Sequence, residues 1–388
     1  MVHFSYYPFD ARPRREAETL ADDGFAVDVI CLRGPDDPFR EVVSGLTLYR
    51  LPIRQKRQGL LRYFFEYAAF SFLTFLLLTV LHIRKRYDVI HIHNMPDFLV
   101  FCAIIPRTFG ASIILDLHDP VPEVFITKYG LAPDHRVIRF LIWVEKISIA
   151  YSQLILTPNI MFRELFISRS CPPEKIHIVM NSPDEKVFFI DEAEAAKKDN
   201  SRFVLMFHGF ITERHGLGIA LEAVARLRHT IPNIMFRVYG EGDYAERFLE
   251  KSKELNITDI IEFGGLVTQE VISGAINTID VGIIPNLNTP FTAINFPTRI
   301  FEFLCMGKPV IVPRTPGIQD YFDEESIHYF DPGNVDDLVE RIRFIYENPE
   351  LAKDVLERGM RIYNAHRWSI ERDNFVNNVR KLVEHPRN

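Results

Sequence analysis

The segment AINFPTRIFEFLCMGKPVIVP, residues 293–313, predicts a short helix followed by a buried strand. Proline is favoured at the first position of a helix, so we expect the helix to begin near Pro297. A Gly-Lys-Pro turn at 307–309 would end it, and the apolar residues that follow indicate a strand. The helix keeps one carboxylate, Glu302, among apolar residues. That carboxylate either faces solvent or binds a ligand.

The same alternation of apolar strands and helices continues along the whole chain. Continuously apolar strands are typical of parallel sheets that are covered on both faces. We therefore expect an α/β protein with two Rossmann-like βαβ domains, at 1–190 and 200–368, joined by the polar linker 191–202. The expected strands lie at 2–7, 26–32, 47–53, 88–94, 112–118, 154–159, 175–181, 203–209, 234–240, 260–265, 281–286 and 309–313.

Composition and charge restrict the class of protein. A chain of 388 residues is long enough for two domains, and its 47% hydrophobic and 25% charged residues are typical of soluble globular proteins. The net charge is −7 and residues 1–190 are nearly neutral, so the acidic second half argues against a nucleic-acid partner. Four widely spaced cysteines and a polar N-terminal region favour a reducing cytoplasm, without a disulfide framework or a secretion signal.

Residues 67–83 form an apolar segment without formal charge, flanked on both sides by basic residues. A helix of this length would measure about 25 Å, which is shorter than the ~30 Å hydrocarbon core of a bilayer. The expected strands before and after it belong to one sheet, so we reject a transmembrane helix. Two alternatives stay open: a helix buried against the sheet, or one in the membrane interface with its basic flanks near anionic headgroups. The flanks favour contact of residues 54–86 with the inner face of the cell membrane. They comprise Arg54, Lys56, Arg57, Arg62, Arg84, Lys85 and Arg86.

Two segments of the second half have the residue types that a nucleotide diphosphate needs. A strand that ends at Gly209 is followed by a loop with Arg214, and glycine lets the backbone approach a ligand while a nearby cation suits a diphosphate. Thr298 and Arg299 begin the helix that carries Glu302, where N–H groups could meet phosphate and the carboxylate could bind ribose hydroxyls. The alternatives are a purely structural loop and a solvated glutamate.

Polar side chains also follow two strands of the first half. Asp116, His118 and Asp119 lie at the carboxyl end of an expected strand, where ligands bind in parallel sheets, and could orient hydroxyl groups or move a proton. A polar loop with a helix cap is the alternative. His91 and His93 share one face of another strand, but no third metal ligand is evident nearby. We expect histidines of the core or a loop there, and no metal.

Taken in order, the motifs resemble a known family. HGFITERHG, VYGEGD, IIEFGGLV, DVGIIPN and NFPTRIFEFLCMGKPVI are similar to the C-terminal nucleotide-binding domain of family 4 glycosyltransferases, which have the GT-B fold. DARPRREAETLADDGFAVDVICLR, YDVIHIHNMPDF, ILDLHDPVPE and IVMNSPD resemble the N-terminal half of bacterial-type members, many of which build cell-surface polysaccharides on lipid carriers. The resemblance covers nearly the whole chain.

The resemblance implies roles for the candidate residues. Glu302 would hold the ribose of a nucleotide sugar, Arg214 would neutralise the departing diphosphate, and His118 would contact the donor sugar with Asp119 beside it. Transfer would retain the anomeric configuration, without a metal or another cofactor. The backbone at Gly264 and Gly265 would face the base. The complete set of expected donor-binding residues is Gly209, Arg214, Gly240, Gly264, Gly265, Asn295, Phe296, Pro297, Thr298, Arg299 and Glu302.

The chain also departs from the family pattern. Ile294 replaces a glutamate that often touches the sugar, so that contact must come from the backbone or Asn295. Phe210 replaces an arginine, and Arg214 precedes the usual lysine position by one residue. The N-terminal glycine-rich loop is absent and DARPRRE takes its place, so Arg12, Arg14 and Arg15 are expected to meet acceptor phosphates. In GT-B proteins the last helix crosses back onto the N-terminal domain, and we expect this of residues 369–388.

These observations predict a retaining glycosyltransferase that moves a sugar from a nucleoside diphosphate sugar to a lipid-linked glycan acceptor at the cytoplasmic face of the membrane. Two alternatives stay open. One is a nucleotide-sugar epimerase of the same fold, which would convert its donor without an acceptor. The other is a catalytically silent homologue that binds a nucleotide or a glycan.

Overall fold

The computed structural model describes residues 1–54 and 60–384, which form two compact units. Unit 1 comprises Met1–Asn181 and Ile370–Asn388, and unit 2 comprises Ser182–Ser369. The boundary thus precedes the expected one at residue 190, and the expected linker 191–202 belongs to unit 2. The reason is that this polar segment is bound there: the Asp191 N–H donates to Asn277 Oδ1 at 3.0 Å, and Lys198 lies 2.5 Å from Asp280.

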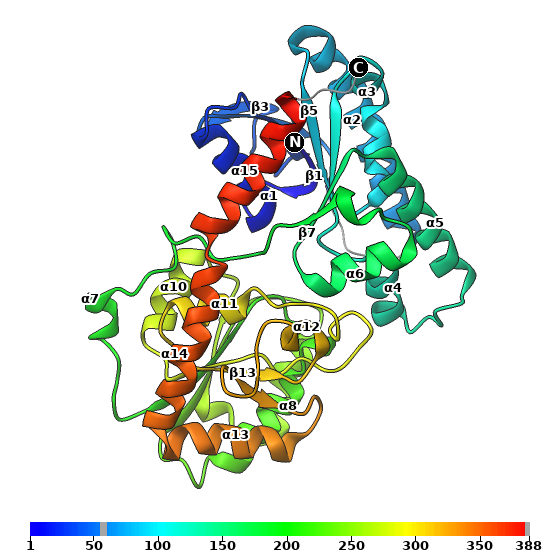
Figure 1. Cartoon of the computed structure of the whole chain (residues 1–388). Coiled ribbons are helices and arrows are strands. Elements are labelled where there is room, and N and C mark those ends of the chain that lie inside the picture. The colour runs from blue at the N-terminus through cyan, green and yellow to red at the C-terminus, as the bar shows by residue number, and fades with distance from the viewer. Residues whose placement is uncertain (55–59, 385–388) are drawn as a thin grey trace. The chain divides into compact units, whose positions relative to one another are not determined.

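Unit 1 is built on an eight-stranded sheet in the order β3-β4-β2-β1-β5-β6-β7-β8 (Figure 1). Every neighbouring pair is parallel except β3 and β4, which form an antiparallel hairpin at the edge. All seven strands expected in this half are confirmed, and β3 was missed. The strands are β1 Val2–Tyr6, β2 Asp28–Leu32, β3 Arg40–Val43, β4 Leu46–Leu51, β5 Val89–His93, β6 Ser112–Asp116, β7 Leu154–Thr157 and β8 Ile176–Ile178.

Helices cover this sheet, and the last of them returns the chain to unit 1. In α15, Phe375 and Val379 are buried, and Glu371 accepts a hydrogen bond from the Met180 N–H at 3.0 Å. Residues 385–388 of the expected last helix lie outside the described residues. The helices are α1 Ala11–Asp22, α2 Leu60–Lys85, η1 Asp97–Ala103, α3 Ile104–Thr108, α4 Val121–Tyr129, α5 Arg136–Tyr151, α6 Ile160–Arg169, η2 Pro173–Lys175 and α15 Trp368–Glu384.

Helix α2 contains the apolar segment, and only one of its faces is buried. Phe70 and Leu78 pack inside, whereas Phe72 and Val80 are exposed. Phe65–Lys85 is long and apolar enough to cross a membrane by length and composition, and 33% of its most apolar window is buried. Strands β4 and β5, before and after α2, belong to the same sheet, which supports a helix lying on the unit rather than a span. Lys56 and Arg57 of the expected basic flank lie outside the described residues.

Unit 2 has a six-stranded parallel sheet in the order β11-β10-β9-β12-β13-β14. Continuously apolar strands such as β9 are buried between helices, with Phe207, Phe236 and Leu221 in one core cluster. All five strands expected here are confirmed, and β14 was missed. The strands are β9 Phe203–His208, β10 Ile234–Tyr239, β11 Ile261–Gly265, β12 Val281–Ile283, β13 Val310–Pro313 and β14 His328–Phe330. The helices are α7 Glu192–Ala195, η3 Glu213–His215, α8 Leu217–Leu227, α9 Ala245–Glu254, η4 Thr258–Ile260, α10 Gln269–Asn277, α11 Arg299–Cys305, α12 Pro316–Gln319, α13 Val335–Glu347 and α14 Pro349–Ala365.

Candidate functional site

Three expected glycines of unit 2 lie together where β9, β10 and β11 end. The Gly209 N–H donates to Tyr239 O at 3.0 Å, and the Gly240 N–H donates to Gly265 O at 2.7 Å. Gly240 has a φ of 137°, and a Cβ there would lie 1.9 Å from Gly209 O. Glycine is therefore required at this position, because any side chain would force the strand ends apart. Gly264, in β11, faces the Tyr239 ring, and a Cβ added at this position would lie 2.2 Å from that ring.

Glu302 is held at the edge of this region by a residue that the sequence analysis did not select. His208, the last residue of β9, places Nε2 3.2 Å from Glu302 Oε2, and Glu302 is 9% exposed. Burial and the nearby Arg299 guanidinium lower the pKa of His208 to about 3. His208 is therefore neutral near pH 7. Its place at the end of an apolar strand was the signal in the sequence that could have identified it.

Two arginines bring positive charge to the same region. Arg299 lies 4.5 Å from the centre of the Phe207 ring and donates from Nη1 to His208 O at 2.7 Å. Burial and the repulsion of Arg214 lower the pKa of Arg299 to about 10, so it stays charged at neutral pH. Arg214 lies 5.6 Å from the Phe291 ring. Two neighbouring guanidinium groups favour an anionic ligand, and a diphosphate has the matching charge.

The loop before Arg299 differs from expectation. Helix α11 begins at Arg299, two residues after the expected start. Phe296, expected to bind the donor, is instead buried in an aromatic cluster, with ring centroids 4.9 Å from both Phe301 and Tyr321. Pro297 is also buried, whereas Thr298 is partly exposed. Asn295 is partly exposed as well, with its backbone N–H donating to Phe291 O at 3.1 Å.

In unit 1 the candidate residues surround the carboxylate of Asp116, the last residue of β6. Arg12 Nε lies 2.8 Å from Asp116 Oδ2 and holds the pKa of this carboxyl well below its usual range, against the effect of burial. Arg12 also donates to Val179 O at 2.8 Å and is 4% exposed. It is thus an internal counter-ion rather than the acceptor-binding cation we expected. Arg15 is likewise buried, and only Arg14 is partly exposed, with Nε 3.1 Å from Glu18.

His118 is the polar group of this cluster that is nearest to solvent. Burial lowers its pKa, but the Asp116 carboxylate, 3.5 Å from Nδ1, outweighs burial and raises the pKa to about 9. Asn94 fixes the surrounding loop, because its Oδ1 accepts from the N–H groups of His118 and Asp119 at 3.2 and 3.4 Å. At neutral pH the site therefore presents an oriented imidazolium.

Four residues of the same cluster offer ligand atoms within 4.8 Å of one another: Glu16, His91, His93 and Asp116. Sequence spacing could not reveal this set, because Glu16 comes from α1 and Asp116 from β6. These residues do not need a metal ion to compensate their charge, because the Arg12 guanidinium already lies 3.3 Å from Glu16 and 2.8 Å from Asp116. Burial also raises the pKa of Glu16, which weakens this carboxyl as a metal ligand.

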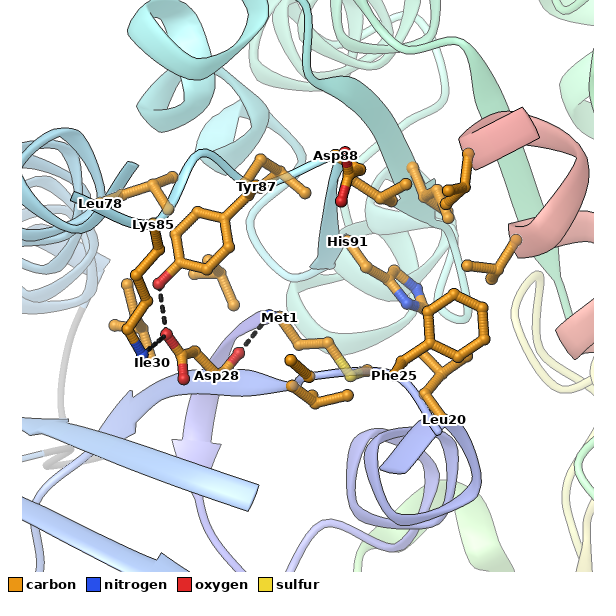
Figure 2. Close-up of a pocket in the computed structure, with 18 of the residues that line it drawn as sticks. Met1, Leu20, Phe25, Asp28, Ile30, Leu78, Lys85, Tyr87, Asp88 and His91 are labelled. Carbon is orange, nitrogen blue, oxygen red and sulfur yellow. Dashed lines mark hydrogen bonds and ion pairs between the residues drawn. The ribbon is translucent and has the colours of Figure 1, made fainter. Parts of the chain in front are cut away.

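A cavity of about 240 Å³ lies at the other end of the strands of the unit 1 sheet, where their amino ends are (Figure 2). Val2, Asp28 and Val89, near the amino ends of β1, β2 and β5, line it. Its carboxylate, Asp28, is bound by Lys85 at 2.6 Å and by the Tyr87 hydroxyl. Ligands of parallel sheets bind at the carboxyl ends of the strands, so this cavity is not the candidate active site.

Comparison with known proteins identifies the family of the chain. Residues 11–182 match the model of the glycosyl transferase 4-like domain, and residues 189–361 match that of glycosyl transferases group 1. An uncharacterized glycosyltransferase of Methanocaldococcus jannaschii is 24% identical over 80% of this chain and 77% of its own length. The amylovoran biosynthesis glycosyltransferase AmsK of Erwinia amylovora is 21% identical, over 47% of this chain and 44% of its own length.

Solved structures establish the fold. Sucrose-phosphate synthase from Thermosynechococcus elongatus has a TM-score of 0.77 at 18% identity, covering 96% of this chain and 93% of that chain. The Anabaena protein HepE, solved with UDP-glucose, has a TM-score of 0.74 at 13% identity, covering 98% of each chain. The expected α/β fold class with two Rossmann-like domains of the GT-B type is confirmed.

Proposed function

This chain belongs to the GT4-type glycosyltransferases, and we propose that it transfers a sugar from a nucleoside diphosphate sugar to a lipid-linked glycan, with retention of anomeric configuration. The observation that carries the donor part is the grouping of Glu302, Arg299 and Arg214 in unit 2. The UDP-glucose bound to HepE supports a nucleotide-sugar donor. The polysaccharide-building role in the name of AmsK supports a glycan acceptor.

Each group of the donor site has a part in this proposal. Glu302 accepts hydrogen bonds from the ribose hydroxyls, and the His208 ring, 3.2 Å away, limits the positions open to its carboxylate. When the bond between the anomeric carbon and the diphosphate oxygen breaks, the nucleoside diphosphate takes the electron pair, and Arg214 and Arg299 neutralise its charge. The acceptor hydroxyl oxygen then bonds to the anomeric carbon, and its proton passes to the departing diphosphate oxygen. The two guanidinium groups supply the charge that a metal supplies in other transferases, so we propose metal-independent transfer.

The groups in unit 1 suit the sugar side of the reaction. His118, held as an imidazolium by Asp116, is proposed to contact the donor sugar, with Asp119 beside it. Its hydrogen bonding and charge would stabilise electron density that moves toward the departing phosphate. We assign Asp116 a positioning role, because its fully buried carboxylate contacts His118.

We also propose that the enzyme acts while bound to the inner face of the cell membrane. The support is the exposed apolar face of α2, with Phe72 and Val80, and the exposed Arg84 and Arg86 at its end. Apolar residues beside basic ones are typical of helices that lie in the interface of anionic membranes.

A thermal-shift screen with UDP-, GDP- and dTDP-sugars tests the donor assignment, since a ligand that binds only the folded state raises its stability. Glu302→Ala should weaken nucleotide binding by about 1.5–3 kcal/mol, the range for a hydrogen bond to a charged group. Glu347→Ala, on the exposed surface of unit 2, is the control. Equal affinity of both variants would remove Glu302 from the site. Conversion of the donor without any acceptor would indicate an epimerase instead, and binding without turnover in membranes would indicate a silent homologue.

A further inference from the structure

Helix α5 exposes a stripe of aromatic and basic residues that the roles above do not use. Phe140 is 58% exposed and Trp143 is 53% exposed, and their ring centroids lie 5.9 Å apart. Arg136, Arg139 and Lys146 are exposed at the helical spacing of this same stripe. Within the described part of the chain none of these three forms an ion pair, so their charge is available to a partner.

Helices α5 and α2 lie on the same side of the unit 1 sheet (Figure 1). The connecting element is η1: its Cys102 donates to Ser71 O of α2 at 3.1 Å, and its Phe101 ring lies 5.0 Å from Tyr151 of α5. Helix α3 joins them, because Arg107 lies 4.1 Å from the centre of the same Tyr151 ring. We call α2, α3 and α5 the three-helix layer.

Apolar and positive groups both concentrate on this layer. Its large exposed apolar side chains are Phe65, Phe72, Leu76, Val80 and Ile83 of α2, Ile104 of α3, and Val137, Phe140 and Trp143 of α5, followed by Phe109 at the end of α3. Among the described residues of the three helices no acidic side chain is exposed, since Glu66 and Glu145 are buried. An apolar surface of this extent next to unpaired basic residues complements an anionic lipid bilayer.

We infer that the whole three-helix layer is the membrane-binding surface, and that Phe140 and Trp143 of α5 insert into the interface of an anionic bilayer. This inference rests on the membrane association proposed above and extends it from one helix to three. Tryptophan and phenylalanine suit the depth of the headgroups, and Arg136, Arg139 and Lys146 would reach the lipid phosphates. Contact through three helices fixes the orientation of unit 1 on the membrane, which a single helix could not do.

The two tryptophans of the chain give a direct test. Trp143 is exposed and Trp368 is 6% exposed, so only Trp143 can change environment on binding. With vesicles of phosphatidylglycerol and phosphatidylcholine, the wild-type emission should shift to the blue and be quenched by brominated acyl chains. Trp143→Phe should abolish both changes. An unchanged wild-type emission in protein that floats with the vesicles would overturn the inference.

Vesicle flotation with matched variants tests whether α5 contributes to membrane binding in addition to α2. Phe140→Ser/Trp143→Ser should weaken binding by more than about tenfold, while Phe39→Ser/Val42→Ser, at the exposed β3 edge, should not. Changing Arg136, Arg139 or Lys146 to Gln should cost about fivefold each, and vesicles of phosphatidylcholine alone should bind poorly. Equal flotation of both double variants would overturn the role of α5 and leave α2 as the contact. If the wild-type protein does not float with any of these vesicles, the proposed membrane association is wrong. Nucleotide binding, measured by thermal shift, tests the proposed transferase function separately.

Discussion

Removal of the Arg12 side-chain charge should destabilise unit 1 strongly. Arg12→Met keeps most of the apolar stem but leaves Asp116 without its partner at 2.8 Å and Val179 O without its donor. Breaking a buried ion pair from one side typically costs about 3–5 kcal/mol, because the remaining charge is buried without compensation. We expect the lower end of this range, since the imidazolium of His118 remains 3.5 Å from Asp116.

The assay must resolve the two units, because a protein of two compact units need not unfold in one step. Hydrogen exchange measured in increasing urea, on peptides from β1, β5 and β6, gives the opening free energy of unit 1 alone. Arg14→Met is the matched control: it lies on the same helix, but its partner Glu18 is on the partly exposed side. Such a pair contributes at most about 1 kcal/mol.

The pH dependence of Arg12→Met distinguishes this reasoning from a simple packing defect. The pKa of His118 is about 9, so the last positive charge in contact with Asp116 disappears as the pH rises through that value. The variant should therefore lose further stability relative to the wild type above about pH 9. If Arg12→Met were as stable as Arg14→Met at pH 7, Arg12 would not be the internal counter-ion described here.

Further predictions concern the two candidate sites. The folded-state pKa of His118 is about 9, above its ordinary value of 6.5. Its contribution to the unfolding free energy is therefore complete below pH 6.5 and is lost as the pH rises to about 9. The unfolding free energy of His118→Gln should not show this decline. Arg214→Ala should reduce donor turnover on the order of a hundredfold with unchanged thermal stability, and wild-type kinetics would exclude Arg214 from the site. Gly216→Ala should destabilise unit 2 by more than about 1 kcal/mol, because φ is 66° and the Cβ would lie 1.8 Å from Pro285 O. In urea unfolding, Gly274→Ala, with open space around it in α10, should be neutral or stabilising by up to about 1 kcal/mol.

Hydrophobic patterning predicted the sheets well, because strands buried on both faces are apolar along their whole length. The two strands that escaped prediction have other patterns. Strand β3 is the outer strand of a short hairpin at the sheet edge, and the exposure of its residues alternates. Strand β14 has only three residues. The domain boundary was placed too late because polar composition resembles a linker, whereas Asp191 and Lys198 bind unit 2.

The candidate site was predictable only where a residue type is unusual for its surroundings. Glu302 stands out in an apolar helix, but its partner His208 comes from a distant strand, and no spacing rule connects them. Arg12 was misjudged because charge suggests exposure. Helical periodicity gives the better indication: Arg12, Glu16 and Leu20 lie four residues apart on one face, and all three are buried.

The return of α15 to unit 1 has a consequence for how the protein is made. Phe375 and Val379 complete the core of unit 1, yet they follow the whole of unit 2 in the sequence and are therefore made after it. Unit 2 is continuous in sequence, whereas the core of unit 1 stays incomplete until α15 has been made. A truncation shortly after residue 369 would therefore leave unit 2 complete and damage unit 1, whose strands precede unit 2 in the sequence.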